Sequence, residues 1–375
     1  MEQRQGALEG VERLMMDFLE FYRGRRVFLT GHTGFKGAWM SRMLVNAGAV
    51  LTGYALTPPT APNLFELAGL EGRMNSVIGD IRDYPALKAA FGAARPEVVI
   101  HMAAQPIVRE SYRDPRTTYE TNVMGTVNLL ECVRGSDSVR SFLNVTTDKV
   151  YLNREWPWGY REDDPLDGYD PYSNSKSCAE LATHSYKSSF FGGPGAPAIS
   201  TARAGNVIGG GDFASDRIIP DCVRAAIEGR DIAVRNPRST RPYQHVLEPV
   251  TAYLMIARRQ WEDGSLAGWY NVGPDERDCV TTGQLVDLFV AHWGGGVKRV
   301  DLAHSQGPHE AGFLKLDCSR IRSALGWRPT WHIDEAVGMT CAWTKVWQAG
   351  GDVPGEMDRE IEIFLKDRAC EGERH

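Results

Sequence analysis

The sequence lacks any apolar run of about 18 residues, the length that a helix needs to span a membrane. Its N-terminus also lacks the positively charged segment followed by an apolar one that marks a secretion signal. Its cysteines form no CxxC pair, and their odd number and wide spacing fit neither a disulfide framework nor a metal site. We therefore expect a cytoplasmic protein with no membrane partner and no bound metal.

An excess of positive charge is absent as well. The 42 basic and 48 acidic residues leave a formal net charge of −6, which argues against a nucleic-acid partner. An anionic ligand would instead be bound by local arginines or helix N-termini. Apolar residues make up 42% of the chain and charged residues 24%, as in ordinary globular proteins, and 375 residues are enough for two packed domains.

Short apolar stretches alternate with amphipathic helical stretches through the first half of the chain. The expected strands are residues 26–30, 50–56, 77–80, 97–101 and 142–146. The expected helices are residues 38–46, 84–91, 117–133 and 172–190. Strands that alternate with helices of this length predict an α/β fold with a Rossmann-type, doubly wound parallel sheet. Ligands of such sheets bind at the carboxyl ends of the strands.

The domain organisation follows from where this alternation begins and ends. Residues 1–23 are predicted to be an N-terminal extension, either a helix packed on the body or a poorly ordered segment. Residues 24–205 form the predicted dinucleotide-binding domain, to which a segment at about 243–275 returns. Residues 206–242 and 276–375 are predicted to form a smaller α/β substrate-binding domain, with helices near 219–228, 318–326 and 334–348.

Glycines recur at every third position directly after the first strand. Gly31 permits a tight turn, Gly34 allows backbone amides to approach a pyrophosphate, and Gly37 lets the next helix pack on the strand. A strand on one side and a helix on the other make this a dinucleotide-binding loop, with Thr33 and Phe35 between the glycines as further cofactor contacts.

Tyr172 and Lys176 lie four residues apart and therefore share one face of the helix predicted at 172–190. A lysine ammonium and a positively charged cofactor ring can lower the pKa of a phenol from about 10, so that the tyrosine acts as a base. A surface pair on a helix is the alternative. The glycine loop upstream and Thr147 at the end of the fifth strand favour catalysis.

The GxxGxxG spacing of the loop resembles that of the extended short-chain dehydrogenase/reductase family, whose members include enzymes that act on sugar nucleotides. The resemblance implies that Asp80 and Ile81, after the third strand, contact the adenine of the cofactor. It also implies that Ala103 and Ala104, after the fourth strand, lie beneath the cofactor.

The usual acceptor for the ribose 2′-hydroxyl is missing from its expected place. No acidic residue occurs between Gly37 and Glu66, although Thr57 could take that role weakly. Arg42 is the single charged residue in the same stretch, so a 2′-phosphate has no cationic cluster to bind it. The choice of NAD as the cofactor therefore rests on the family resemblance.

The stretch Thr147-Asp148-Lys149 distinguishes the reaction type. Nucleotide-sugar 4,6-dehydratases of the extended family carry Thr-Asp-Glu here, and the lysine resembles the CDP-glucose branch. Seven further stretches resemble that branch, namely residues 30–37, 101–109, 121–127, 153–162, 168–176, 203–212 and 241–249. The resemblance implies redox-neutral dehydration, in which Tyr172 serves hydride transfer at C4 and Asp148 donates a proton to the leaving C6 hydroxyl.

The role of Lys149 stays open. It removes the C5 proton only in its neutral form, and otherwise it positions the acid. The alternative to a catalytic role is that Asp148 only caps a turn at the end of the strand and that Lys149 is solvated.

Substrate contacts are predicted on the C-terminal side of the sheet. Arg241 is the first candidate for the diphosphate because guanidinium groups match phosphate oxygens. Asn206 and Arg217 are second candidates, and Gln105 follows the cofactor turn. His245 lies close to Arg241 in the sequence and is a further candidate, although a buried structural role is the favoured interpretation.

Three other functions compete with a CDP-glucose dehydratase. They are a nucleotide-sugar 4-epimerase, a dehydratase of another nucleotide sugar, and a dinucleotide-binding protein without chemistry. The helices at 117–133 and 172–190 resemble those that pair across the family's dimer, so we expect at least a homodimer.

Overall fold

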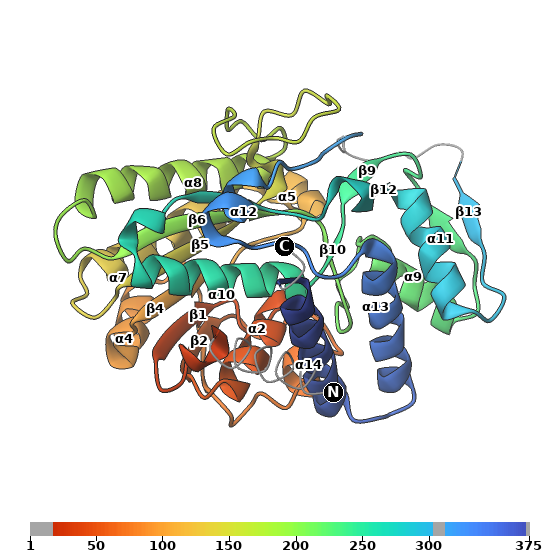
Figure 1. Cartoon of the computed structure of the whole chain (residues 1–375), viewed down its shortest axis with the longest axis horizontal. Helices are drawn as coiled ribbons and strands as arrows, with labels where there is room; N and C mark the ends of the chain where they lie inside the picture. Colours follow the sequence, from red (N-terminus) through yellow and green to blue (C-terminus); the bar gives the residue numbers. More distant parts are fainter. Residues whose placement is uncertain (1–17, 303–311, 373–375) are drawn as a thin grey trace, which may run out of the picture.

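The computed structural model describes residues 18–302 and 312–372. Its centre is a sheet of seven parallel strands in the order β11-β6-β5-β4-β1-β2-β3 (Figure 1). The strands are β1 Arg26–Thr30, β2 Val50–Ala55, β3 Asn75–Ile78, β4 Val98–His101, β5 Ser141–Thr147, β6 Ala198–Ala204 and β11 Trp269–Val272. The order confirms the predicted doubly wound α/β fold, because the chain reverses direction across the sheet between β3 and β4.

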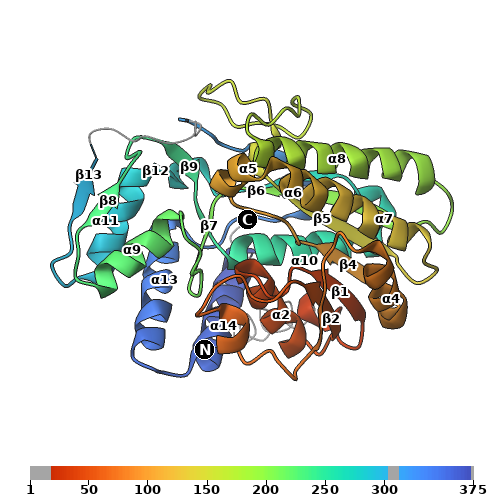
Figure 2. The ribbon, with the colours of Figure 1, turned by 180° about the vertical axis from the view of Figure 1, so that it is seen from behind.

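Helices cover both faces of the sheet. The long ones are α2 Phe35–Asn46, α4 Tyr84–Ala94, α7 Gly125–Arg134, α8 Pro171–Phe190 and α10 Leu247–Glu262. Figure 1 shows α2 and α10 in front of the strands, and Figure 2 shows α4 and α7 on the opposite side. The short helices α5 Val108–Arg113 and α6 Pro115–Tyr119 precede α7, which continues from α6 through a π-helical turn at Glu120–Met124.

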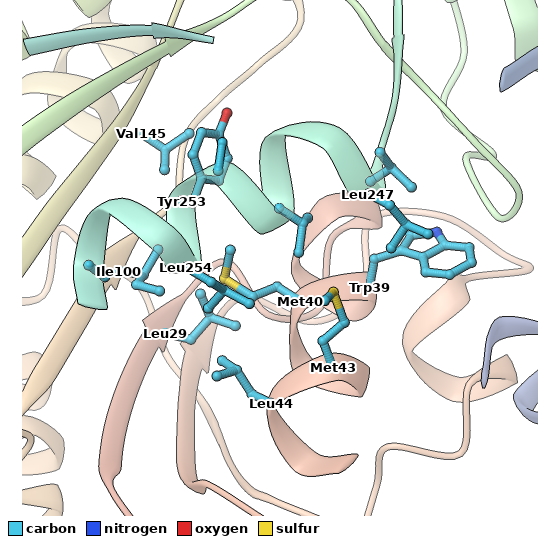
Figure 3. Packing of buried hydrophobic residues seen from close by; sticks show 14 of the residues in the cluster. Leu29, Trp39, Met40, Met43, Leu44, Ile100, Val145, Leu247, Tyr253 and Leu254 are labelled. Carbon is cyan, nitrogen blue, oxygen red and sulfur yellow. The ribbon is translucent and has the colours of Figure 1, made fainter. Parts of the chain in front are cut away.

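Alternating side chains of the strands build the two apolar layers. On β1, Val27 and Leu29 belong to the cluster beneath α2 and α10, whereas Phe28 belongs to the cluster beneath α4 and α7. Such alternation is what a strand buried on both faces requires. Figure 3 shows Leu29 packed with Met40 of α2 and Leu254 of α10, which fixes both helices on the sheet.

A smaller α/β part lies beside the carboxyl ends of the strands. It contains β7 Val207–Ile208, β8 Ile232–Val234, β9 Thr240–Pro242, β10 Gln244–His245, β12 Cys279–Thr281, β13 Arg299–Asp301, α9 Ile218–Ile227, α11 Thr282–Trp293 and α13 Ile333–Gln348. Its elements pair as β8–β13, β9–β12 and β7–β10, and a separate apolar cluster joins α9, α11 and α13 (Figure 1).

Two helices of the C-terminal third pack on the sheet side of the molecule. These are α12 Ser319–Leu325 and α14 Val353–Gly372, and buried residues of both belong to the same cluster as α2 and α10. An ion pair of 2.5 Å between Arg42 of α2 and Asp358 of α14 adds to this packing. The predicted domain boundaries stay a prediction, and α14 ties the last segment to the dinucleotide-binding part.

Most of the predicted N-terminal extension, residues 1–17, lies outside the described residues. The end of the extension packs on the body, because Tyr22 is fully buried and donates a 2.6 Å hydrogen bond to the Leu254 carbonyl oxygen. All seven cysteines are free. Within residues 18–302 and 312–372, no helix is both long and apolar enough for a membrane span, and no cluster of metal-binding side chains occurs.

Candidate active site

The turn between β1 and α2 packs so closely on the protein's own backbone that two of its positions require glycine. Gly31 has a φ of +79°, and a Cβ atom there would lie 2.9 Å from the Ala103 nitrogen. A Cβ atom on Gly37 would lie 2.1 Å from the Gly31 oxygen. Gly34 is the N-cap of α2, and no side chain caps this helix. The turn therefore fits a pyrophosphate, which helix N-termini bind through backbone amides.

Other predicted cofactor residues stand at the carboxyl ends of neighbouring strands. The Thr33 hydroxyl donates to the Leu56 carbonyl oxygen at 2.9 Å, which fastens the glycine turn to the end of β2. After β3, Asp80 accepts hydrogen bonds from the Arg82 backbone at 2.9 Å and from its guanidinium at 2.6 Å. The hydrogen bonds from Arg82 lower the pKa of Asp80.

Ile81 and the turn after β4 complete this half of the site. Ile81 is buried against Gly125 at the start of α7. The Ala103 nitrogen donates to the Thr30 hydroxyl at 3.1 Å, and Ala104 follows in the same turn. These contacts bring the predicted cofactor residues to one edge of the sheet, while their individual roles stay predictions.

Within the described stretch between Gly37 and Glu66, the end of β2 carries no unpaired cation for a 2′-phosphate. Arg42 is the single charged residue between Gly37 and Glu66, and Asp358 of α14 binds it. Thr57 is exposed beyond the end of β2. This surrounding therefore suits a dinucleotide with a free ribose hydroxyl better than a phosphorylated one.

Helix α8 presents the predicted redox pair to the sheet. It begins after the N-cap Asp170, whose carboxylate accepts from the Ser173 nitrogen at 3.0 Å. Burial raises the pKa of Tyr172 to about 12, and a hydrogen bond with Thr147 opposes that rise. Burial also lowers the pKa of Lys176 to about 8, and its ammonium donates to the Val145 carbonyl oxygen at 3.3 Å.

The Thr147-Asp148-Lys149 stretch turns at the end of β5. Asp148 begins a short 3₁₀ turn and has a fully buried side chain. Its Oδ1 atom accepts from the Thr147 hydroxyl at 3.0 Å and from the Lys149 ammonium at 2.9 Å. Lys149 also donates to Asn206 at 3.2 Å, and 28% of its side chain is exposed.

One cleft of about 660 Å³ joins predicted catalytic residues to predicted substrate residues. The predicted residues that line it are Phe35, Thr147, Lys149, Tyr172, Asn206, Arg217 and Arg241. Its described lining does not include Asp148, which lies behind Lys149. Lys176 is likewise buried, one helical turn beyond Tyr172.

The two predicted phosphate-binding arginines line the part of the cleft formed by the smaller domain. Arg217, the N-cap residue of α9, forms an ion pair with Asp212 at 3.0 Å. Arg241 lies on β9, is 7% exposed, and donates to the Thr240 carbonyl oxygen at 2.9 Å. Both guanidinium groups are thus held in the wall that faces the catalytic residues.

Two predicted substrate residues lie apart from the described cleft lining. His245 is fully buried between Trp39 and Trp331, with ring centroids 6.1 and 4.9 Å away. Burial lowers its pKa to about 3. The Gln105 side chain forms its hydrogen bonds within its own loop. Its amide nitrogen donates to the Ile107 carbonyl oxygen, and its amide oxygen accepts from the Ile107 backbone nitrogen. The contacts of both residues are structural, and their predicted substrate roles remain without support.

Several cleft residues were not singled out by sequence reasoning. Lys36 lies inside the glycine motif, and burial together with the charges of Lys176 and Arg217 lowers its pKa to about 7. Arg109 crosses the cleft to form an ion pair with Asp216 at 3.2 Å. Both residues lie within stretches that carry the family resemblance, and their position in those motifs could have identified them as candidate site residues.

The sequence matches the family model described as GDP-mannose 4,6 dehydratase over residues 28–340. It is 48% identical over 354 residues to a protein of Salmonella typhimurium named CDP-glucose 4,6-dehydratase, a match that covers 92% of this chain and 97% of the relative.

Two solved structures show the same fold. A UDP-glucose 4-epimerase from Thermotoga maritima with UDP-glucose has a TM-score of 0.74 at 20% identity, covering 86% of this chain and 99% of that chain. A dTDP-glucose 4,6-dehydratase from Bacillus anthracis in complex with NAD has a TM-score of 0.72 at 20% identity, covering 88% of this chain and 99% of that chain. At such identity the likeness concerns the fold alone.

Proposed function

The chain belongs to the GDP-mannose 4,6 dehydratase family, and from this premise we propose that it is a hydro-lyase that converts CDP-glucose to CDP-4-dehydro-6-deoxyglucose with bound NAD. The observation that carries the proposal is the Thr147-Asp148-Lys149 turn beside Tyr172 at one cleft. A 4-epimerase needs the tyrosine and a hydroxyl group, whereas dehydration also needs a proton carrier at C5 and C6. The 48% identity to the Salmonella typhimurium relative supports CDP-glucose as the substrate.

The first half of the reaction uses Tyr172 as the base. NAD would be held at the glycine turn after β1 and would supply the hydride acceptor for C4 and then the hydride donor for C6. Tyr172 removes the proton of the C4 hydroxyl, and Thr147 holds the phenol by a hydrogen bond. Because burial raises the pKa of Tyr172 to about 12, the base needs nearby positive charge; Arg217 lowers that pKa, and Lys176 lies one helical turn away.

The elimination uses the Asp148–Lys149 pair. The 4-keto group acidifies the C5 proton, which Lys149 removes after passing its own proton to Asp148, whose Oδ1 atom lies 2.9 Å from the ammonium. The resulting ammonium then gives a proton to the departing C6 hydroxyl, and water leaves. When the hydride reaches C6, C5 takes up a proton, which balances the proton that Tyr172 removed from the C4 hydroxyl. The general-acid role predicted for Asp148 stays a prediction. Asp148 contacts Lys149 and Thr147 but does not belong to the described cleft lining. We therefore propose that Asp148 passes its proton to the C6 hydroxyl through Lys149.

The nucleotide part of the substrate is assigned to the wall of the smaller domain. Arg217 and Arg241 are placed to bind the diphosphate, because guanidinium groups form paired hydrogen bonds with phosphate oxygens. Asn206 stands between this wall and Lys149, so it can contact both the substrate and the proton carrier.

We further propose that the protein works in the cytoplasm as a homodimer. The free cysteines suit a reducing compartment. The dimer is expected through α7 and α8, where Leu181 is 52% exposed and Phe190 is 52% exposed. Light scattering should give a mass at least twice the 41.6 kDa of one chain, and a monomer would refute the dimer.

Incubation with nucleotide hexoses tests the function directly. The purified protein with CDP-glucose should give a product lighter by one water, with the alkali-induced absorbance of a 4-keto sugar. CDP-galactose as the product would instead show a 4-epimerase. A 4-keto product from dTDP- or GDP-hexoses, but not from CDP-glucose, would overturn the nucleotide and keep the reaction. Binding of NAD without any product would leave only a dinucleotide-binding protein.

A further inference from the structure

A buried carboxylate lies one helical turn beyond the catalytic lysine. Tyr172, Lys176 and Glu180 follow one another at four-residue spacing on α8, so all three face the sheet. The side chain of Glu180 is fully buried. An ionised carboxylate is costly to bury unless it is paired and hydrogen-bonded, and the mechanism above does not use it.

Glu180 is held by β5 and β6 rather than by solvent. Arg203 of β6, also fully buried, places its Nε atom 2.8 Å from Oε1 and its Nη2 atom 2.6 Å from Oε2. From β5, the Thr146 hydroxyl donates to Oε1 at 2.5 Å. The bidentate ion pair therefore holds the middle of α8 on β5 and β6, the two strands next to the cleft.

The same arginine extends the network to the cleft. Its Nη1 atom donates to the Tyr151 hydroxyl at 2.8 Å and to the Glu162 carbonyl oxygen at 2.9 Å. The Tyr151 hydroxyl in turn donates to Asn271 at 2.6 Å. Tyr151 lines the cleft two residues after Lys149, so one buried ion pair joins α8 to the cleft wall beside the Thr147-Asp148-Lys149 turn.

The charges around Lys176 oppose one another. When they are protonated, Lys36 of α2 and His101 of β4 are positive charges that repel the ammonium of Lys176. Tyr172 lies on the same helix as Lys176. Burial lowers the pKa of Lys176 to about 8, whereas the negative charge of Glu180 raises it.

We propose that Glu180 is a positioning residue that, clamped by Arg203, both fixes α8 on β5 and β6 and supplies the negative charge that keeps Lys176 an ammonium ion beside Tyr172. The catalytic consequence rests on the proposed function, whereas the charge on Lys176 can be measured without it. Loss of the carboxylate should let Lys176 lose its proton at lower pH and leave Tyr172 without its cationic neighbour.

The test compares three variants with the wild type. Glu180→Gln removes the charge but leaves Arg203 buried and unpaired, which can impair folding. Glu180→Gln combined with Arg203→Met removes both charges and keeps the fold free of an unpaired ion. Asp358→Asn is the matched control, because it breaks the ion pair between Arg42 and α14 on the other side of the sheet.

Titration of Lys176 is followed by carbon-13 NMR of Cε-labelled lysine, with the Lys176 signal assigned by its absence in Lys176→Arg. The midpoint should fall by about one pH unit in Glu180→Gln, fall by less in the double variant because the opposing charge of Arg203 is removed as well, and stay at the wild-type value in Asp358→Asn. The alkaline limit of kcat/KM for CDP-glucose should move down in parallel. An unchanged midpoint in the double variant would overturn the proposal.

The proposed function and the role of Glu180 can be refuted independently. If the wild type transforms no nucleotide hexose while the Lys176 midpoint still falls in both Glu180 variants, the proposed function is wrong and the role of Glu180 stands. If the wild type forms the 4-keto product but the midpoint does not move, Glu180 is only structural.

Discussion

Replacing Lys149 with glutamine should stop the reaction after oxidation at C4 and before the loss of water. Glutamine can keep a hydrogen bond to Asp148 or Asn206, whose oxygens lie 2.9 and 3.2 Å from the Lys149 ammonium, but it cannot exchange a proton. Tyr172 is untouched, so oxidation at C4 should proceed. Because positioned acid–base groups contribute roughly 10²–10⁴-fold to a rate, kcat for the 4-keto-6-deoxy product should fall by about that factor.

Stopped-flow absorbance of the reduced nicotinamide separates the two steps. In Lys149→Gln, the signal should rise on mixing with CDP-glucose and then persist, whereas in the wild type it should decay as hydride returns to C6. Lys345→Gln on α13 is the matched control, since its ammonium donates to the His292 carbonyl oxygen far from the cleft lining. Turnover of Lys149→Gln within a few-fold of the wild type would refute the assignment of Lys149 as proton carrier.

Three further predictions concern the cofactor turn and stability. Gly37→Ala should abolish NAD binding in calorimetry, because its Cβ atom would lie 2.1 Å from a backbone oxygen, while Gly92→Ala, with nothing within 4 Å, should bind normally. Trp39→Ala should lower the free energy of unfolding in urea by about 3–5 kcal/mol, since the side chain is fully buried and donates to Gly210; a loss below about 1 kcal/mol would contradict the packing. Burial raises the pKa of Glu180, but Arg203 outweighs burial and holds that pKa at about 2, below the unfolded value of about 4.3. The pair should therefore stabilise the fold above about pH 4 and lose this contribution as the pH falls toward 2, a dependence that Glu180→Gln should flatten.

Much of the fold could be predicted because local patterns and global topology agree. The five predicted strands and the helices of the first half all occur, with ends shifted by a few residues. Helix α8 begins where Asp170-Pro171 predicted it, because the N-cap carboxylate and the first-turn proline act locally. The glycine turn could also be recognised, since its positive φ and close backbone approach require glycine whatever the distant partners are.

Features that depend on tertiary contacts could not be predicted in the same way. Helix α10 is buried on nearly all sides, so it lacks the apolar stripe that marks a surface helix. Nothing in the sequence tells that α14 folds back onto Arg42. For His245 the sequence offered both a substrate role and a buried structural role, and the tertiary contacts with Trp39 and Trp331 are what place its ring away from the described cleft lining. The burial of Asp148 behind Lys149 likewise depends on how the end of β5 turns.

The central claim is an internal transfer of hydride that ends in loss of water. CDP-glucose labelled with deuterium at C4 tests it most directly, with the product examined by mass spectrometry and NMR. The account predicts a 4-keto-6-deoxy sugar that retains the deuterium at C6. Deuterium that remains at C4 of a CDP-hexose with inverted configuration would contradict the account and identify an epimerase.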